Sequence, residues 1–294
     1  MQTYVLSCCS TADLTAAFLA ERDISYIPFH FTLDGVSYPD DLGKSVPFAD
    51  FYAAMDKGAM TATSQVSVGE YLAYFRQFLA AGKDVLHLCL SSGLSGTFQS
   101  ATIAQKQLAE EFPDRKLYVI DSLCASSGYG LLMDALADLR ADGKTIEEAR
   151  DFAEANKLRV QHWFFSTDLK YYVRGGRISK TAGAIGGILG ICPLLHMDGA
   201  GKLVPVSKVR SVKKVARAAV DQMEALATGG TEYAGKCFLS ESACPDYAKL
   251  VTDEVDARFP HVSGKCKVFP IGTTIGSHTG PGTVALFFFG APRT

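Results

Sequence analysis

The sequence lacks an excess of charge of either sign. Its 294 residues contain 29 lysines and arginines against 31 aspartates and glutamates, a formal net charge of −2. Nucleic acids and anionic membranes are bound mainly by clustered positive charge, so this balance removes the electrostatic case for either partner. No apolar run approaches the roughly 20 residues that span a bilayer. No positive charge precedes an apolar segment at the start of the sequence. We therefore expect neither a membrane span nor a signal peptide.

Patterned cysteines and histidines are also missing. The eight cysteines are scattered without a C-x-x-C pair, and most lie in apolar runs, as small buried side chains do. The six histidines show no H-x-x-x-H spacing. These patterns predict free thiols in a reducing, cytoplasmic compartment and no metal ion. The usual nucleotide-binding loops are absent, so we expect no cofactor.

The first half of the chain does contain a repeated strand–helix pattern. Short apolar runs are each followed by a small polar loop and an amphipathic helix, and they lie at residues 4–7, 85–90 and 117–120. Three such units predict a parallel sheet covered by helices, with ligands beyond the carboxyl ends of its strands. Asp13, Ser95 and Asp121 fall at that edge. Residues 67–70 form a capping box for another helix, whereas 24–33 reads as one extended segment and 61–66 as a polar loop.

The second half follows a different pattern, which predicts a mixed sheet. The expected elements are a strand at 163–166, a short helix at 168–173, a hairpin at 191–210, a helix at 211–226, a strand at 236–241, a helix at 245–259, and strands at 265–271 and 284–289. His278 is expected in a glycine-rich loop before the last strand. A chain of this length suits two α/β domains, which we place at residues 1–158 and 159–294.

Residues 91–100 link a predicted buried strand to a predicted helix through small hydroxylated residues. Such a junction turns backbone N–H groups and the positive end of the helix dipole toward an anion. The alternative is a simple tight turn, and the spacing does not decide between the two. The segment is not a G-x-S-x-G nucleophile elbow, because Thr97 stands where the second glycine should be.

A few polar residues outside the predicted core are candidates for a binding site. They are Thr63, Ser64, Ser95, Thr97, Arg174, Arg177 and His278. Taken singly, the hydroxyls also suit loops, and Arg177 also suits a surface ion pair. An imidazole between glycines has little packing role, which makes His278 the strongest of these candidates.

Blocks of residues along the whole chain resemble the DegV family in identity and order. They are 10–14 (STADL), 63–65 (TSQ), 90–97 (LSSGLSGT), 121–122 (DS), 175–178 (GGRI) and 278–282 (HTGPG). The resemblance implies a two-domain α/β protein that buries one long-chain fatty acid between its domains. It also implies a non-catalytic, lipid-carrying subunit of a fatty acid kinase, whose separate kinase subunit phosphorylates the bound carboxylate to an acyl phosphate.

Carried over by position, the resemblance also implies a carboxylate site. The hydroxyls of Thr63 and Ser95 would hold the carboxylate, with Arg177 and His278 as cationic or donor partners. The other residues implied at the ligand are Ser64, Gly96 and Thr279.

Two positions depart from the family pattern. Cys9 stands where an acid is usual, and Val66 stands where proline is usual. The first puts in doubt any acidic group at that edge, and the second loosens the loop without removing its hydroxyls.

The physical chemistry of a buried lipid agrees with the implied site. Burying a sixteen-carbon chain is worth about 12 kcal/mol gross at about 0.8 kcal/mol per methylene. Burying its carboxylate unpaired would cost several kcal/mol, so hydroxyl donors and a helix N-terminus are needed at the mouth. For the apolar lining we expect residues 182–195 and the strand at 286–289.

Two other functions remain open at this point. An esterase-like hydrolase would use Ser95 as nucleophile, His278 as base and Asp121 to orient the histidine. A phosphate or sugar binder would use the same loops.

Overall fold

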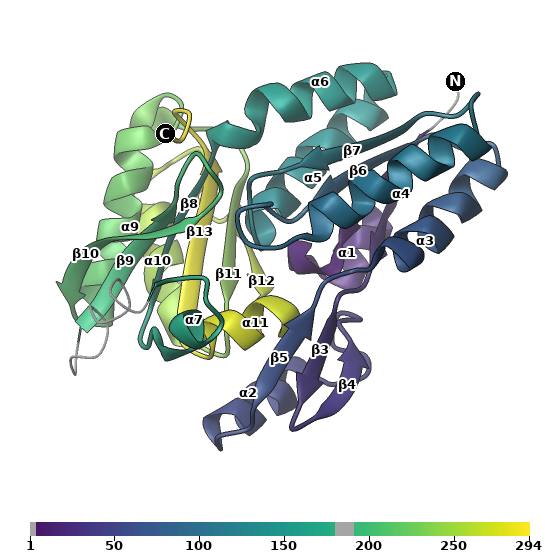
Figure 1. The fold of residues 1–294 in the computed structure, drawn as a ribbon. Coiled ribbons are helices and arrows are strands. Elements are labelled where there is room, and N and C mark those ends of the chain that lie inside the picture. The colour runs from purple at the N-terminus through teal and green to yellow at the C-terminus, as the bar shows by residue number, and fades with distance from the viewer. Residues whose placement is uncertain (1–3, 180–190) are drawn as a thin grey trace.

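The computed structural model describes residues 4–179 and 191–294, which form an α/β protein built on two large sheets (Figure 1). The first sheet is four-stranded and entirely parallel, in the order β2-β1-β6-β7. Its strands are β1 (Val5–Cys9), β2 (Ile24–Ile27), β6 (Val85–Cys89) and β7 (Leu117–Asp121). The predicted parallel sheet is confirmed.

Two pairs of helices cover this parallel sheet. They are α3 (Val68–Ala80) with α4 (Thr97–Glu111), and α5 (Ser127–Ala141) with α6 (Ile146–Asn156). The predicted capping box starts α3, because the Ser67 hydroxyl accepts the N–H of Glu70 and the Glu70 carboxylate accepts the N–H of Ser67. The short helix α1 (Ala16–Glu21) is capped by Thr15, and a 3₁₀ turn (Ser10–Ala12) precedes it.

The second large sheet is six-stranded and mixed, in the order β10-β9-β8-β13-β11-β12. Its strands are β8 (Val160–Ser166), β9 (Ile191–Met197), β10 (Leu203–Arg210), β11 (Cys237–Glu241), β12 (Lys267–Pro270) and β13 (Thr283–Phe289). Only β11 and β12 run parallel, as the predicted mixed sheet requires. Helices α9 (Val212–Leu226) and α10 (Pro245–Arg258) pack against it.

Helix α5 lies between the two large sheets. It contacts β1 of the parallel sheet and β8, β11 and β13 of the mixed sheet. Every residue from 127 to 137 is therefore buried, although a helix covering one sheet usually buries only one face. The predicted domain boundary at residue 158 lies in the turn Lys157–Arg159 between α6 and β8, and it stays a prediction.

A small third sheet was missed by the sequence analysis. It is antiparallel, in the order β4-β3-β5, and consists of β3 (His30–Leu33), β4 (Val36–Pro39) and β5 (Thr61–Ser64). The prediction of a loop at 61–66 was therefore wrong. The segment 24–33 is extended as predicted, but it forms two strands, β2 and β3, that belong to different sheets. Four polar or small residues give β5 no apolar alternation, so only its pairing with β3 reveals the strand.

Helix α2 (Phe48–Asp56) covers the small sheet, and α11 (Thr273–Thr279) connects it to the mixed sheet (Figure 1). His278 lies in the last turn of α11, so the predicted glycine-rich loop at this residue was wrong. The helix ends at Gly280, whose φ of +69° suits glycine. A second short helix, α7 (Lys170–Arg174), contacts α11.

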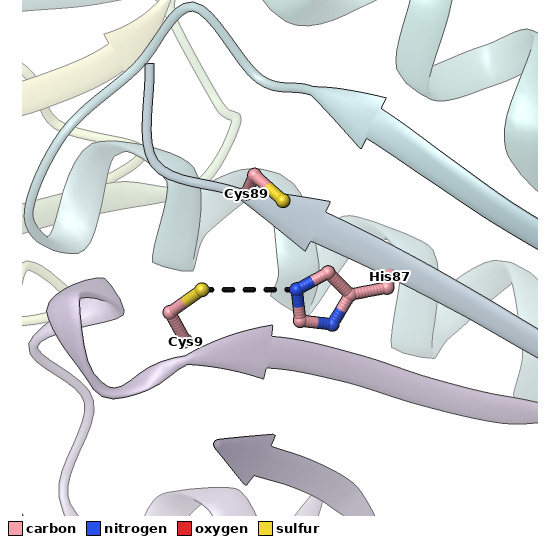
Figure 2. Close-up of side chains that lie close together, drawn as sticks. All are labelled: Cys9, His87 and Cys89. Carbon is pink, nitrogen blue, oxygen red and sulfur yellow. Dashed lines mark hydrogen bonds between the residues drawn. The ribbon is translucent and has the colours of Figure 1, made fainter. Parts of the chain in front are cut away.

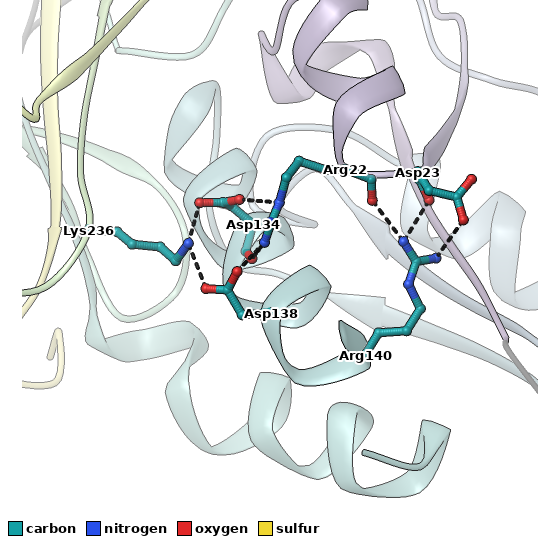
Figure 3. Close-up of polar contacts among 6 residues, drawn as sticks. All are labelled: Arg22, Asp23, Asp134, Asp138, Arg140 and Lys236. Atoms are coloured by element: carbon teal, nitrogen blue, oxygen red, sulfur yellow. Dashed lines mark hydrogen bonds and ion pairs between the residues drawn. The ribbon is translucent and has the colours of Figure 1, made fainter. Parts of the chain in front are cut away.

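An ion-pair network joins α5 to the mixed sheet (Figure 3). Asp134, whose side chain is 3% exposed, lies 2.7 Å from the Nε of Arg22 and also pairs with Lys236, the residue before β11. The Lys236 ammonium lies 2.7 Å from Asp138 as well. Two cations thus compensate a buried carboxylate between the sheets.

No helix in the described ranges is long and apolar enough to cross a membrane.

Candidate ligand cavity

A cavity of about 480 Å³ lies between the parallel sheet and the mixed sheet. This volume is within the roughly 300–1,000 Å³ of small-molecule sites. Its wall is mostly apolar and comes from both halves of the chain: Phe29, Leu90, Leu94, Ala125, Phe164, Tyr172, Met197, Leu203, Ile271, Ile275, Ala285 and Phe287. An elongated apolar molecule could be buried here.

The alternation of strand residues explains why β8 and β13 line the cavity. Phe164 pairs with Ala285 across these antiparallel strands, so both side chains lie on one face of the sheet. Ala285 and Phe287 line the cavity, whereas Val284 and Leu286, which point to the other face of the sheet, belong to the core beneath α9 and α10. The predicted role of 286–289 in the lining therefore holds for Phe287 but not for Leu286. Of the other predicted segment, residues 182–190 lie outside the described residues, and residues 191–195 in β9 do not line this cavity, so the prediction was wrong for them.

One part of the cavity wall is polar, and its centre is a contact between β5 and α11. The Thr63 hydroxyl lies 2.7 Å from Nε2 of His278. Burial, with the charges of Arg177 and Arg174, lowers the pKa of His278 to about 4. The imidazole is therefore neutral at pH 7, and its buried Nδ1 has no hydrogen-bond partner among the described residues.

Arg177 is a half-buried cation on the same wall. Its guanidinium donates to the carbonyl oxygens of Gly175 at 2.6 Å and Leu94 at 3.2 Å. Burial lowers its pKa, and none of the carboxylates in the described residues forms an ion pair with it. Such a cation next to an apolar cavity favours an anionic group on the ligand.

Ser95 and Gly96 bring the N-terminus of α4 to the cavity. The Ser95 hydroxyl oxygen accepts the N–H of Thr97 at 3.2 Å, which leaves its hydrogen for another acceptor. Gly96 is the N-cap residue of α4. A Cβ at Gly96 would come within 2.7 Å of the side-chain oxygen of Gln65, so glycine allows the residue after β5 to approach the start of α4.

The structure brings all seven residues predicted at the ligand around this one cavity: Thr63, Ser64, Ser95, Gly96, Arg177, His278 and Thr279. Two other candidates do not line it. Arg174 is exposed and contacts Thr61, and Thr97 is buried against Tyr71.

Further polar lining residues were missed by the sequence analysis. They are Gln65, Ser126, His162, Thr274 and Thr283. His162 alternates with Phe164 on β8, so a period of two in this strand was the available signal.

The residues of an esterase-like relay are not assembled. His278 bonds to Thr63 and not to Ser95, and its Nδ1 has no described carboxylate to orient it. Asp121 instead accepts the backbone N–H groups of Ser92 and Leu123, each at 3.1 Å. Ser95, His278 and Asp121 therefore do not form the hydrogen-bonded nucleophile, base and orienting acid of a hydrolase.

Comparison with known proteins agrees with this architecture. A sequence model described as the DegV family matches residues 9–291. The chain belongs to the DegV family. A DegV domain-containing protein of Clostridium perfringens is 33% identical over 290 residues, which cover 99% of this chain and 98% of that protein.

Two further similar proteins have names that describe a function. A fatty acid-binding protein of Thermotoga maritima is 31% identical over 290 residues, covering 94% of this chain and 93% of that protein. The crystal structure of the fatty acid kinase B3 protein of Streptococcus pneumoniae, loaded with linoleic acid, matches with a TM-score of 0.83 and 22% identity. It covers 98% of this chain and 99% of that one, and it shows the shared DegV fold.

Proposed function

We propose that this DegV protein binds one long-chain fatty acid in the cavity between its two large sheets. The carboxylate lies at Thr63, Ser95 and Arg177, with His278 beside them, and the tail lies against Phe164 and its neighbours. The observation that carries the proposal is a largely apolar cavity whose polar wall holds a half-buried cation without a described anionic partner.

The energetics of the site favour a long acyl chain over a small polar anion. Each buried methylene contributes about 0.8 kcal/mol, and the ordering cost of association offsets a large part of the sum. The carboxylate avoids an unpaired charge because Arg177 and two hydroxyls are within the same cavity. A phosphate or a sugar would leave the apolar wall in contact with a polar ligand.

His278 takes the role of a neutral partner rather than a cation. Its low pKa keeps the imidazole uncharged at pH 7. In the tautomer that carries the proton on Nε2, this N–H donates to the Thr63 oxygen, and the Thr63 O–H is left to donate to the carboxylate. Arg177 then supplies the positive charge. This division differs from the sequence-based expectation that either residue could be cationic.

The protein is proposed to present its lipid rather than to transform it. A separate kinase subunit would phosphorylate the carboxylate in the cytoplasm, and this chain would require no cofactor or catalytic group of its own. The exposed Ser64 and Gln65 of the cavity wall give a partner access to the carboxylate end. The name of the Streptococcus pneumoniae protein supports this role, since that protein belongs to a fatty acid kinase.

Lipid extraction tests the binding directly. Purified protein should release about one equivalent of fatty acid, identified by mass spectrometry after solvent extraction. Delipidated protein should take up oleate or palmitate again. Absence of an extracted lipid together with no uptake of either acid would overturn the proposal.

A matched pair of serine variants tests the carboxylate site. Ser95→Ala should weaken oleate binding by about tenfold, the worth of one hydrogen bond to a charged group, at unchanged stability. Ser92→Ala removes an exposed hydroxyl of the same loop that is not part of the cavity, and it should bind like the wild type. If Ser95→Ala unfolds the protein while Ser92→Ala does not, Ser95 is a structural residue and the site is misassigned.

A further inference from the structure

Three side chains outside the cavity form a buried cluster between the parallel sheet and α3. Figure 2 shows Cys9 at the end of β1 facing His87 and Cys89 of β6. Strands β1 and β6 are parallel neighbours in which Ser7 is opposite His87. Because side chains alternate, the residues two positions further on, Cys9 and Cys89, lie on the same face.

The distances within this cluster suit a metal ion. The two thiol sulfurs and a ring nitrogen of His87 all lie within 4.8 Å of one another, and Cys9 Sγ lies 3.7 Å from His87 Nε2. The Tyr71 hydroxyl lies 3.2 Å from Cys9 Sγ and 3.9 Å from Cys89 Sγ. Zinc bonded to sulfur and nitrogen at about 2.0–2.3 Å in a tetrahedron separates its ligand atoms by about 3.5–3.8 Å. The Cys9–His87 distance and the two distances from Tyr71 to the sulfurs differ from these values by only a few tenths of an ångström.

The surroundings of His87 fix its orientation toward the two thiols. Its Nδ1 lies 2.8 Å from the Ser7 hydroxyl, which in turn contacts the Tyr74 hydroxyl at 2.8 Å. Donation from Nδ1 to Ser7 leaves the Nε2 lone pair pointing toward Cys9. Metal-ligating histidines characteristically have such a hydrogen bond at the other ring nitrogen. The Tyr71 and Phe75 rings hold the imidazole edge-on from α3.

We propose that Cys9, His87 and Cys89 bind a zinc ion, with the Tyr71 hydroxyl at the fourth position. On binding, the two thiols lose their protons to solvent, so that two thiolates and a neutral imidazole compensate the double charge of Zn²⁺. A neutral assembly of this kind suits a site in which all three ligand residues are fully buried. Because its coordination is completed by the protein, the site is structural rather than catalytic.

The proposed site also borders the ligand cavity. The Tyr71 hydroxyl lies 2.7 Å from the Thr97 hydroxyl at the start of α4, next to Ser95 and Gly96. A metal at this point would fix α3 and α4 against the sheet edge. Zinc binding does not depend on the proposed lipid, since no ligand residue of the cluster lines the cavity.

The test uses tag-free full-length protein, because a histidine tag would itself bind zinc. Protein from cells grown with added zinc should contain about one zinc per chain by elemental analysis. Cys9→Ser and Cys89→Ser should lower the content at least about tenfold, and Ser7→Ala should weaken affinity by about 10–100-fold. Cys8→Ser is the matched control, because Cys8 is equally buried on the adjacent position of β1 and does not belong to the cluster.

A second measurement covers the case in which the cysteine variants fail to fold. Wild-type protein unfolded with a chelator and refolded with Co²⁺ should show the visible bands of tetrahedral cobalt–thiolate coordination, and Cys8→Ser should show them too. The proposal is overturned if wild-type protein contains no zinc and refolds without cobalt bands. It is also overturned if mass spectrometry of the denatured, unreduced protein finds Cys9 and Cys89 joined as a disulfide, or if Cys8→Ser lowers zinc as much as Cys9→Ser.

Discussion

His278 should make the protein less stable in mild acid. Its pKa is 6.5 in the unfolded chain and about 4 in the folded protein, where burial and the nearby Arg177 and Arg174 disfavour the charged imidazole. Between these values the unfolded chain binds a proton that the folded protein does not bind. The contribution is therefore fully present above about pH 6.5 and is lost as the pH falls toward 4.

The magnitude follows from the size of the pKa difference. The pKa of His278 differs by about 2.5 between the unfolded and folded states, and each pKa unit is worth 1.36 kcal/mol. The free energy of unfolding should therefore fall by about 3 kcal/mol between pH 7 and pH 4. Urea denaturation at a series of pH values measures the free energy of unfolding for the wild type and for His278→Gln, which keeps a polar partner for Thr63. The wild type should lose about 3 kcal/mol more than the variant over this range.

The control for this experiment is a histidine on the surface of the protein, away from the cavity. His261→Gln removes an exposed imidazole whose contact with Glu232 is open to solvent, and exposed pairs of this kind are worth under about 1 kcal/mol, so this variant should stay within about 1 kcal/mol of the wild type over the same range. Parallel wild-type and His278→Gln profiles would refute the reasoning, because they would mean that the folded protein accepts a proton on His278 as easily as the unfolded chain does.

Two further predictions concern the cavity wall and the ion-pair network. Ala285→Phe fills room otherwise taken by several methylenes at about 0.8 kcal/mol each, so oleate affinity should fall by about 100-fold in a fluorescence displacement assay, and unchanged affinity would place the tail elsewhere. Lys236→Ala removes a charge-assisted bond to Asp134 and should cost about 1–3 kcal/mol of unfolding free energy. Lys249→Ala, in an exposed pair with Asp253, should cost under about 0.5 kcal/mol, and equal losses would contradict the interpretation.

Local sequence patterns predicted most of the two large sheets. The apolar run of β6 and the capping box at Ser67 depend only on residues close in sequence, so they can be recognised without knowledge of the fold. The hairpin β9–β10 was similarly marked by the turn at 198–201. The small sheet could not be predicted from local patterns, because β5 is held by hydrogen bonds to β3, about 30 residues earlier in the chain, rather than by its own composition.

The cluster at Cys9 shows why a candidate metal site can escape recognition in a sequence. Its three residues do not follow a ligand spacing within one segment, since Cys9 and Cys89 are 80 positions apart. They meet because β1 and β6 pair in a particular register, in which Ser7 lies opposite His87. Cys9 is also one of the two departures from the family pattern, and the proposed zinc site accounts for a cysteine at this position. The other, Val66, is fully buried in the core.

The amino-acid sequence by itself determined the parallel sheet, the mixed sheet and seven of the polar or glycine residues around the cavity, because strand periodicity and family motifs are properties of the chain. Only the tertiary structure decided that Thr63 contacts His278, that Arg177 lacks a described anionic partner, and that α5 is buried on all sides. These properties depend on the dielectric surroundings and on contacts between distant segments. Such surroundings exist only in the folded protein, in which the two large sheets pack on opposite sides of α5.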